Sequence, residues 1–192
     1  MHHQTVYSVG YGNLELPKLV DLLKQHEIEY LIDVRSSPYS RFNPNYSRAP
    51  LEASLRRDAI RYVFMGDLLG GLPDDADCYM DGKVDYDLVE QRPQFQRGIA
   101  RLCKASSLGH RVCLFCSEAA PSRCHRSKLI GQVLVARDVP VEHILHDGTL
   151  MNQQAVIHQL TGGQKRLFGD GFTSRKRYGQ VQADSRQGGL HE

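Results

Sequence analysis

The feature that most constrains the fold is the alternation of short apolar runs with segments of helical periodicity. The apolar runs predict strands over residues 7–10, 30–34, 62–65, 111–115 and 141–145. The intervening segments predict helices over residues 16–23, 50–58, 95–103, 126–135 and 152–160. Strands that alternate with helices are joined by right-handed crossovers. The pattern therefore predicts a three-layer α/β fold: a mostly parallel sheet of about five strands with helices on both faces.

The length of 192 residues suits one domain with a substantial core. We expect that single α/β domain over residues 1–161. From residue 162 onward Gly, Gln, Lys and Arg dominate, and few apolar side chains occur. We therefore expect residues 162–192 to be a basic, poorly ordered tail that folding does not require.

Charge and cysteine content narrow the class of protein. The net charge is only +2, which argues against a wholly basic coat for nucleic acid but leaves room for a local basic cleft. No apolar run of about 18 residues is present, and residues 1–5 lack the apolar core of a signal peptide. The five cysteines are odd in number and lie mostly among apolar residues, which does not suggest a disulfide framework. We therefore expect a cytoplasmic protein with no membrane partner.

The polar residues that follow the predicted strands indicate where a site lies. In parallel sheets ligands bind beyond the carboxyl ends of the strands. The residues at those ends are Gly10 and Tyr11 after the first strand, Asp33, Arg35 and Ser36 after the second, and Cys116 and Glu118 after the fourth. We expect them to converge in one crevice.

Residues 112–127 concentrate the reactive groups. Cys116 ends a strand near Arg123 and Arg126, so its thiol could have a lowered pKa and act as a nucleophile; the alternative is a small buried core residue. His125 is a candidate general base, because an imidazole titrates near neutrality. Glu118 is either a general acid/base or an ion-pair partner that orients the arginines.

Cys116, Cys124 and His125 carry zinc-type donor atoms, but neighbouring residues such as Cys124 and His125 seldom point at one ion, and no Cys-x2-Cys pair accompanies them. We therefore expect no metal ion and no other cofactor.

Arginine binds phosphate and carboxylate through its bidentate fork, which makes Arg35, Arg41 and Arg126 candidate anion ligands. Tyr39 and Phe42 lie among them in a long polar loop, where aromatic rings can stack on bases or pack onto the domain. The predicted catalytic residues are Cys116, Glu118 and His125. The predicted anion-binding residues are Gly10, Tyr11, Asp33, Arg35, Ser36, Arg41, Cys124 and Arg126.

Several motifs together resemble the domain-of-unknown-function 488 family. They are Ser8-Val9-Gly10-Tyr11, Asp33-Val34-Arg35-Ser36-Ser37-Pro38, Asn43-Pro44, Leu69-Gly70-Gly71, and Cys116-x-Glu118 followed by Cys124-His125-Arg126. The resemblance covers roughly residues 5–150 and implies an α/β domain found largely in prokaryotes, with no settled activity.

Three functions fit these residues. The leading hypothesis is an enzyme that binds an anionic substrate, phosphorylated and either a nucleotide or a nucleic acid. A non-catalytic module that binds nucleic acid or nucleotides would use the same arginines. A rhodanese-like thiol transferase is third: it shares an Asp-Val-Arg strand end and a strand–Cys–loop–Arg–helix unit, but six residues without glycine separate Cys116 from Arg123 here. The sequence leaves the substrate and the oligomeric state open.

Overall fold

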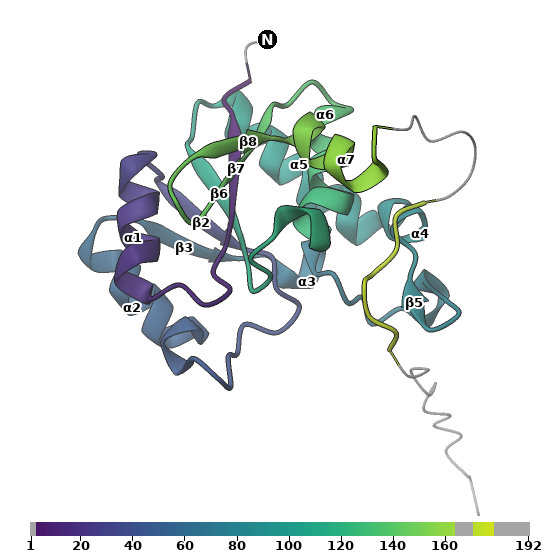
Figure 1. Cartoon of the computed structure of the whole chain (residues 1–192), viewed down its shortest axis with the longest axis horizontal. Helices are drawn as coiled ribbons and strands as arrows, with labels where there is room; N and C mark the ends of the chain where they lie inside the picture. Colours follow the sequence, from purple (N-terminus) through teal and green to yellow (C-terminus); the bar gives the residue numbers. More distant parts are fainter. Residues whose placement is uncertain (1–2, 164–170, 179–192) are drawn as a thin grey trace, which may run out of the picture.

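The central element is a six-stranded sheet whose order confirms the predicted α/β fold (Figure 1). The computed structural model describes residues 3–163 and 171–178. The strands of the sheet, in spatial order, are β3 (Arg61–Phe64), β2 (Tyr30–Asp33), β6 (Val112–Cys116), β1 (Val6–Gly10), β7 (Val141–Ile144) and β8 (Leu150–Asn152). The first five are parallel, and β8 pairs antiparallel with β7 at one edge.

Helices cover both faces of this sheet. On one face α1 (Leu16–Gln25) and α2 (Arg48–Arg57) bury their leucines against β1, β2 and β6. On the other face α3 (Gly66–Leu69), α5 (Pro93–Ser107), η4 (Arg126–Gly131) and α6 (Gln132–Val135) form a second core cluster. The remaining elements are η1 (Pro44–Tyr46), η2 (Ala76–Cys78), β4 (Tyr79–Met80), β5 (Lys83–Val84), α4 (Tyr86–Glu90), η3 (Pro121–Arg123) and α7 (Gln153–Thr161).

The central strand β6 shows how side-chain alternation divides the core. All five of its residues are buried, as expected of a strand with helices on both sides. Phe115 belongs to the α1/α2 cluster, whereas Leu114 and Cys116 belong to the cluster under α5 and η4. Successive side chains of a strand point to opposite faces. The end of β6 therefore presents an aromatic ring to one face and a thiol to the other.

Residues 66–84, for which no element was predicted from the sequence, contain several short ones. They hold α3, η2 and the antiparallel hairpin β4–β5. Each of these elements has two to four residues, which is too short to generate a recognisable hydrophobic period. The edge strand β8 escaped prediction for the same reason.

Residues 171–178, which we call the C-terminal strap, pack against the domain beside α4 and β5 (Figure 1). Ser174 is buried; its N–H donates to the carbonyl of Val84 at 2.9 Å, and its Oγ accepts from the N–H of Val84 at 3.0 Å. The N–H of Tyr86 donates to the carbonyl of Phe172 at 3.0 Å. These eight residues differ from the poorly ordered tail expected over 162–192, because they complete backbone hydrogen bonds that the β5–α4 segment leaves open. Residues 164–170 and 179–192 of that tail lie outside the described part of the chain.

A polar network runs through the core beneath β1 and β7. The Nη1 group of Arg126 donates to Oγ of Ser8 at 3.1 Å, and Oγ of Ser8 lies 2.5 Å from Nδ1 of His143. Nε2 of His143 lies 2.8 Å from Oε1 of Gln153. All four side chains are buried. The amide nitrogen of Gln153 donates to other residues, so its Oε1 accepts from Nε2 of His143, and Nδ1 of the neutral ring accepts from the Ser8 hydroxyl.

This arrangement requires a neutral imidazole at His143. Burial lowers the pKa of His143 to about 4, although its hydrogen bond to Gln153 acts in the opposite direction. The positive charge of Arg126 lowers this pKa further.

We expect His143 to make the protein less stable as the pH falls from about 6.5 to 4. Over that window the unfolded chain takes up a proton at this histidine, whereas the folded chain does not. Between pH 7.5 and 5 the free energy of unfolding should fall by on the order of 2 kcal/mol from this group alone. Urea unfolding at both pH values measures the change. In His143→Gln this component should vanish, while His158→Gln, at an exposed position of α7, should keep it. An equal pH dependence in His143→Gln and the unmodified protein would contradict the assignment.

We also expect the C-terminal strap to stabilise the domain. A chain ending at residue 163 loses the hydrogen bonds to Val84 and Tyr86, worth about 1–2 kcal/mol together. Its Tm should fall by a few degrees, since ~1 kcal/mol shifts Tm by about 2–4 °C in a domain of this size. The control is a chain ending at residue 178, which keeps every described strap contact and should keep the original Tm. Equal Tm values for the two truncations would show that the strap adds no stability.

Candidate functional site

The densest group of reactive side chains consists of Cys116, Cys124 and His125. Cys116 is the last residue of β6, and the chain returns through η3 to place Cys124 and His125 beside it. Nδ1 of His125 lies 4.0 Å from Sγ of Cys116 and 3.7 Å from Sγ of Cys124. The three ligand atoms all lie within 4.8 Å of one another, and all three side chains are buried. We call this group the Cys–Cys–His cluster.

The imidazole of His125 is held in one orientation. Its Nε2 lies 3.0 Å from the carbonyl oxygen of Val34, which can only accept, so Nε2 carries the proton. Nδ1 therefore presents a lone pair to the two sulfur atoms. On the other side of the ring, a Cβ at Gly71 would come within 2.8 Å of the imidazole. Glycine at this position lets the Gly70–Gly71 backbone pack directly against His125.

The two thiols of the cluster differ in pKa. The hydrogen bond from Cys124 is the main cause that holds the pKa of Cys116 well below its usual value, and the charge of Arg126 acts in the same direction against burial. Burial and the neighbouring Cys116 raise the pKa of Cys124. Within the pair the proton is therefore favoured on Cys124 over Cys116.

Arg126 fixes the loop that follows β6. Its Nη2 group donates to the carbonyl oxygens of Glu118 and Ala119, the latter at 2.9 Å. A Cβ at Gly10 would overlap both the carbonyl of Glu118 and this guanidinium. Gly10 thus lets the loop and the arginine approach the end of β1. Among the described residues Nε of Arg126 has no hydrogen-bond partner.

Asp33 and Arg35 form a separate polar group. Nε and Nη2 of Arg35 donate to the two carboxylate oxygens of Asp33 at 2.9 and 2.6 Å, and Tyr62 donates to the same carboxylate at 2.6 Å. The guanidinium lies 4.8 Å from the ring centre of Phe115 and 5.7 Å from that of Tyr11. Nη1 of Arg35 has no partner among the described residues. This group therefore packs on the α1/α2 face of the sheet.

The predicted site is thus divided by the sheet. Gly10, Cys116, Cys124, His125 and Arg126 come together under η4. Tyr11, Asp33 and Arg35 lie at the same edge of the sheet but on its other face.

The remaining predicted residues lie outside both groups. Glu118 points toward the C-terminal strap, where it pairs with Arg175 at 3.1 Å. Oγ of Ser36 accepts from the N–H of Leu72 at 2.9 Å, and Ser36 lines a groove of about 610 Å³ that continues past α3. Arg41 is exposed on the loop after β2.

Two tyrosines close to the cluster were not predicted from the sequence. Burial is the main cause of the raised pKa of Tyr86, and the adjacent Cys124 adds to it. The pKa of Tyr178, in the strap, is raised by burial and by the charges of Cys116 and Glu118. A single tyrosine in a basic C-terminal segment gives no indication in the sequence that it will lie near the Cys–Cys–His cluster.

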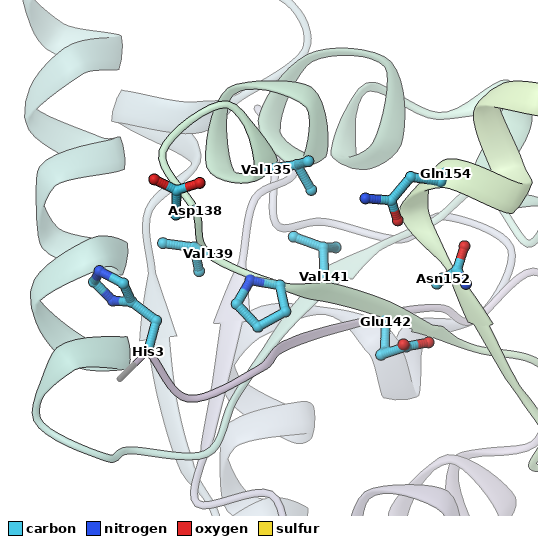
Figure 2. A pocket seen from close by; sticks show the side chains of 9 residues that line it. His3, Val135, Asp138, Val139, Val141, Glu142, Asn152 and Gln154 are labelled. Atoms are coloured by element: carbon cyan, nitrogen blue, oxygen red, sulfur yellow. The ribbon is translucent and has the colours of Figure 1, made fainter. Parts of the chain in front are cut away.

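A larger pocket lies at the opposite edge of the sheet (Figure 2). It has a volume of about 710 Å³ and lies between the end of α6 and the start of β7. The described residues that line it include Val135, Val141 and the carboxylates of Asp138 and Glu142, but no cysteine. The reactive side chains are therefore gathered at the carboxyl edge of the strands, away from this pocket.

Comparisons with known proteins identify a family. The model of the family "Domain of unknown function DUF488" matches residues 15–133, which is more than half of the chain and includes the Cys–Cys–His cluster and the Asp33–Arg35 pair. Searches of curated proteins and of solved structures each find no match. Within residues 3–163 and 171–178, no helix has the length and apolar character needed to cross a membrane. The chain belongs to the DUF488 family.

Proposed function

We propose that this chain is an enzyme that acts on an anionic substrate, with Cys116 as its nucleophile. The observation that carries the proposal is the order of three groups: Sγ of Cys116, Nδ1 of His125 at 4.0 Å, and the Val34 carbonyl that orients the imidazole. A nucleophile, a base and a group that orients the base form the arrangement that activates thiols in covalent catalysis.

The buried guanidinium of Arg126 supports an anionic substrate. Its Nε keeps an N–H group without a partner among the described residues, on the same face of the sheet as Cys116. A buried donor without an acceptor costs roughly 1–3 kcal/mol, which an oxygen of the substrate would recover. Guanidinium groups bind phosphate and carboxylate, so a phosphorylated substrate such as a nucleotide fits this proposal.

The covalent step uses both thiols of the cluster. Sγ of Cys116 bonds to the phosphorus of the substrate while the bond from phosphorus to the leaving oxygen breaks. The leaving oxygen takes the proton of Cys124, whose thiol is hydrogen-bonded to Cys116. Water then attacks the same phosphorus, the S–P bond breaks, and the proton from water returns to Cys124.

Binding of nucleic acid is a second candidate function, favoured by two exposed rings. Phe42 is 96% exposed and Tyr39 is 70% exposed on the loop that carries Arg41. Such rings can stack on bases, each worth about 1–3 kcal/mol. If so, Phe42→Ala should weaken binding of a labelled single-stranded oligonucleotide about tenfold, whereas Leu108→Ala, at an exposed apolar position on the C-terminal side of α5, should not. Equal affinities in both variants would remove this role from Phe42.

The pH dependence of alkylation tests the thiol role of Cys116. We expect iodoacetamide to label Cys116 with a midpoint well below about 8.5, the usual pKa of a thiol, because Cys124 and Arg126 stabilise the thiolate. Mass spectrometry of the reduced, chelator-treated full chain reports each cysteine separately. The midpoint is the relevant quantity, since burial slows the reaction at every pH.

Cys103, which is half-buried and outside the cluster, serves as the internal control. Cys124→Ala removes the hydrogen-bond donor, so the midpoint for Cys116 should rise by at least about one unit, which corresponds to ~1.4 kcal/mol. A midpoint for Cys116 equal to that of Cys103 would show that the thiol is not activated.

A further inference from the structure

We infer that the Cys–Cys–His cluster is a binding site for one zinc ion, with three protein ligands and one open coordination position. Two thiolates and one imidazole are donors that zinc prefers. Nothing else in the described chain brings three such groups together: the cluster is the one set of Cys, His, Asp or Glu side chains there whose ligand atoms all converge.

The spacing of the ligand atoms fits a tetrahedral ion. Zn–S bonds of about 2.3 Å and Zn–N bonds of about 2.0–2.1 Å place sulfur and nitrogen ~3.6 Å apart. The observed separations from Nδ1 of His125 are 3.7 Å to Cys124 and 4.0 Å to Cys116. Changes of a few tenths of an ångström, within the reach of side-chain rotation, would bring both sulfur–nitrogen pairs to this spacing, and the two sulfur atoms already lie within 4.8 Å of each other.

The backbone explains why two neighbouring residues face the same point. Cys124 has an extended conformation, with φ −115° and ψ 147°, and His125 is helical, with φ −62° and ψ −24°. In a continuous strand neighbouring side chains would point to opposite sides. The switch from extended to helical backbone between Cys124 and His125 turns both side chains toward Cys116. The expectation that neighbouring residues do not point at one ion therefore does not hold for this pair.

The surroundings of His125 meet the usual requirement of a metal-bound histidine. Such residues donate their second ring N–H to a carbonyl or carboxylate, which fixes the tautomer. Here Nε2 donates to the carbonyl of Val34, and Gly71 packs against the ring. The imidazole is therefore held with the lone pair of Nδ1 directed at the two sulfur atoms before any ion binds.

Charge indicates what fills the fourth position. Two thiolates neutralise Zn²⁺, and the buried guanidinium of Arg126 then leaves one positive charge nearby. Glu118 lies outside the cluster and pairs with Arg175. The open position therefore suits a small anion or a bound hydroxide, as in catalytic zinc sites with three protein ligands.

The zinc site goes beyond the proposed function and does not depend on it. It rests on the positions of three donor atoms, whether or not Cys116 attacks a substrate. Zinc would occupy the electron pair with which Cys116 reacts, so the metal-loaded protein should resist alkylation. Labelling without metal tests the nucleophile, and metal binding tests the site, so the two can fail separately.

Metal titration of the reduced full chain tests the inference directly. One equivalent of Zn²⁺ per chain should bind, as measured by calorimetry and by metal analysis after gel filtration. Co²⁺ at the same site should give the near-ultraviolet thiolate-to-cobalt absorption and the intense visible bands of tetrahedral cobalt. Less than about 0.2 equivalents of zinc retained, or cobalt spectra without thiolate bands, would overturn the inference.

A ligand variant and a matched control locate the ion. Cys124→Ser should weaken zinc affinity by more than about 100-fold, because even partners outside the ligand set are worth 10- to 100-fold. Cys103→Ser, which changes a cysteine outside the cluster, should bind zinc as tightly as the unmodified chain.

Should Cys124→Ser fail to fold, protection in the unmodified chain decides the question. Zinc should shield Cys116 and Cys124 from iodoacetamide while leaving Cys103 reactive. Equal labelling of Cys116 with and without zinc would place the ion elsewhere and overturn the inference.

Discussion

The buried guanidinium of Arg126 is the constraint on which the rest of this structure depends. A charge taken out of water is tolerated only when its surroundings are polar and hydrogen-bonded. The chain meets this demand from three directions: the hydroxyl of Ser8, the carbonyls of Glu118 and Ala119, and the thiol of Cys116, whose pKa the guanidinium lowers. Each of these contacts also positions a part of the candidate site. The same interactions therefore stabilise the core and shape the Cys–Cys–His cluster.

The consequences of this charge extend well beyond its own contacts. Gln153 donates through its amide nitrogen to the Ser127 carbonyl and to Gln132, so its Oε1 accepts a hydrogen bond from Nε2 of His143. Nδ1 of the neutral His143 then accepts from the hydroxyl of Ser8, which in turn accepts from Arg126. The π-helical turn η4, which begins at Arg126, is thereby linked by hydrogen bonds to α7. Single π-helical turns are frequent at functional sites, where they re-aim side chains that an α-helix would carry elsewhere.

The sequence predicted the parts of this fold that repeat a pattern. The five parallel strands and the long helices are visible because the apolar residues of β6 or α5 recur with a clear period. The edge β8, the hairpin β4–β5 and the strap are short, and they are held by pairing between distant segments. No local sequence pattern predicts such pairing. Length, more than composition, separates the elements that could be predicted from those that could not.

For the candidate site, the residues involved were easier to predict than the directions in which their side chains point. The strand-end rule placed Gly10 and Cys116 at one edge, and the loop after β6 brings Cys124, His125 and Arg126 to the same place. It could not show that Arg35 would turn to the other face, because that depends on the alternation of β2 and on its pairing with Asp33. Nor could spacing show that Cys124 and His125 converge, since the convergence depends on two backbone conformations at the start of η4.

The strap links the chemistry of the cluster to its accessibility. Cys116 is only 6% exposed, and Tyr178 of the strap lies near enough for the charge on Cys116 to affect its pKa. The strap is attached by a few backbone hydrogen bonds and by the partly exposed pair Arg175–Glu118, and such pairs contribute about 1 kcal/mol or less. Segments with few buried contacts open at a small fraction of the global unfolding free energy. We therefore expect the strap to open more readily than the rest of the domain, while Arg126 and its network hold the cluster in place.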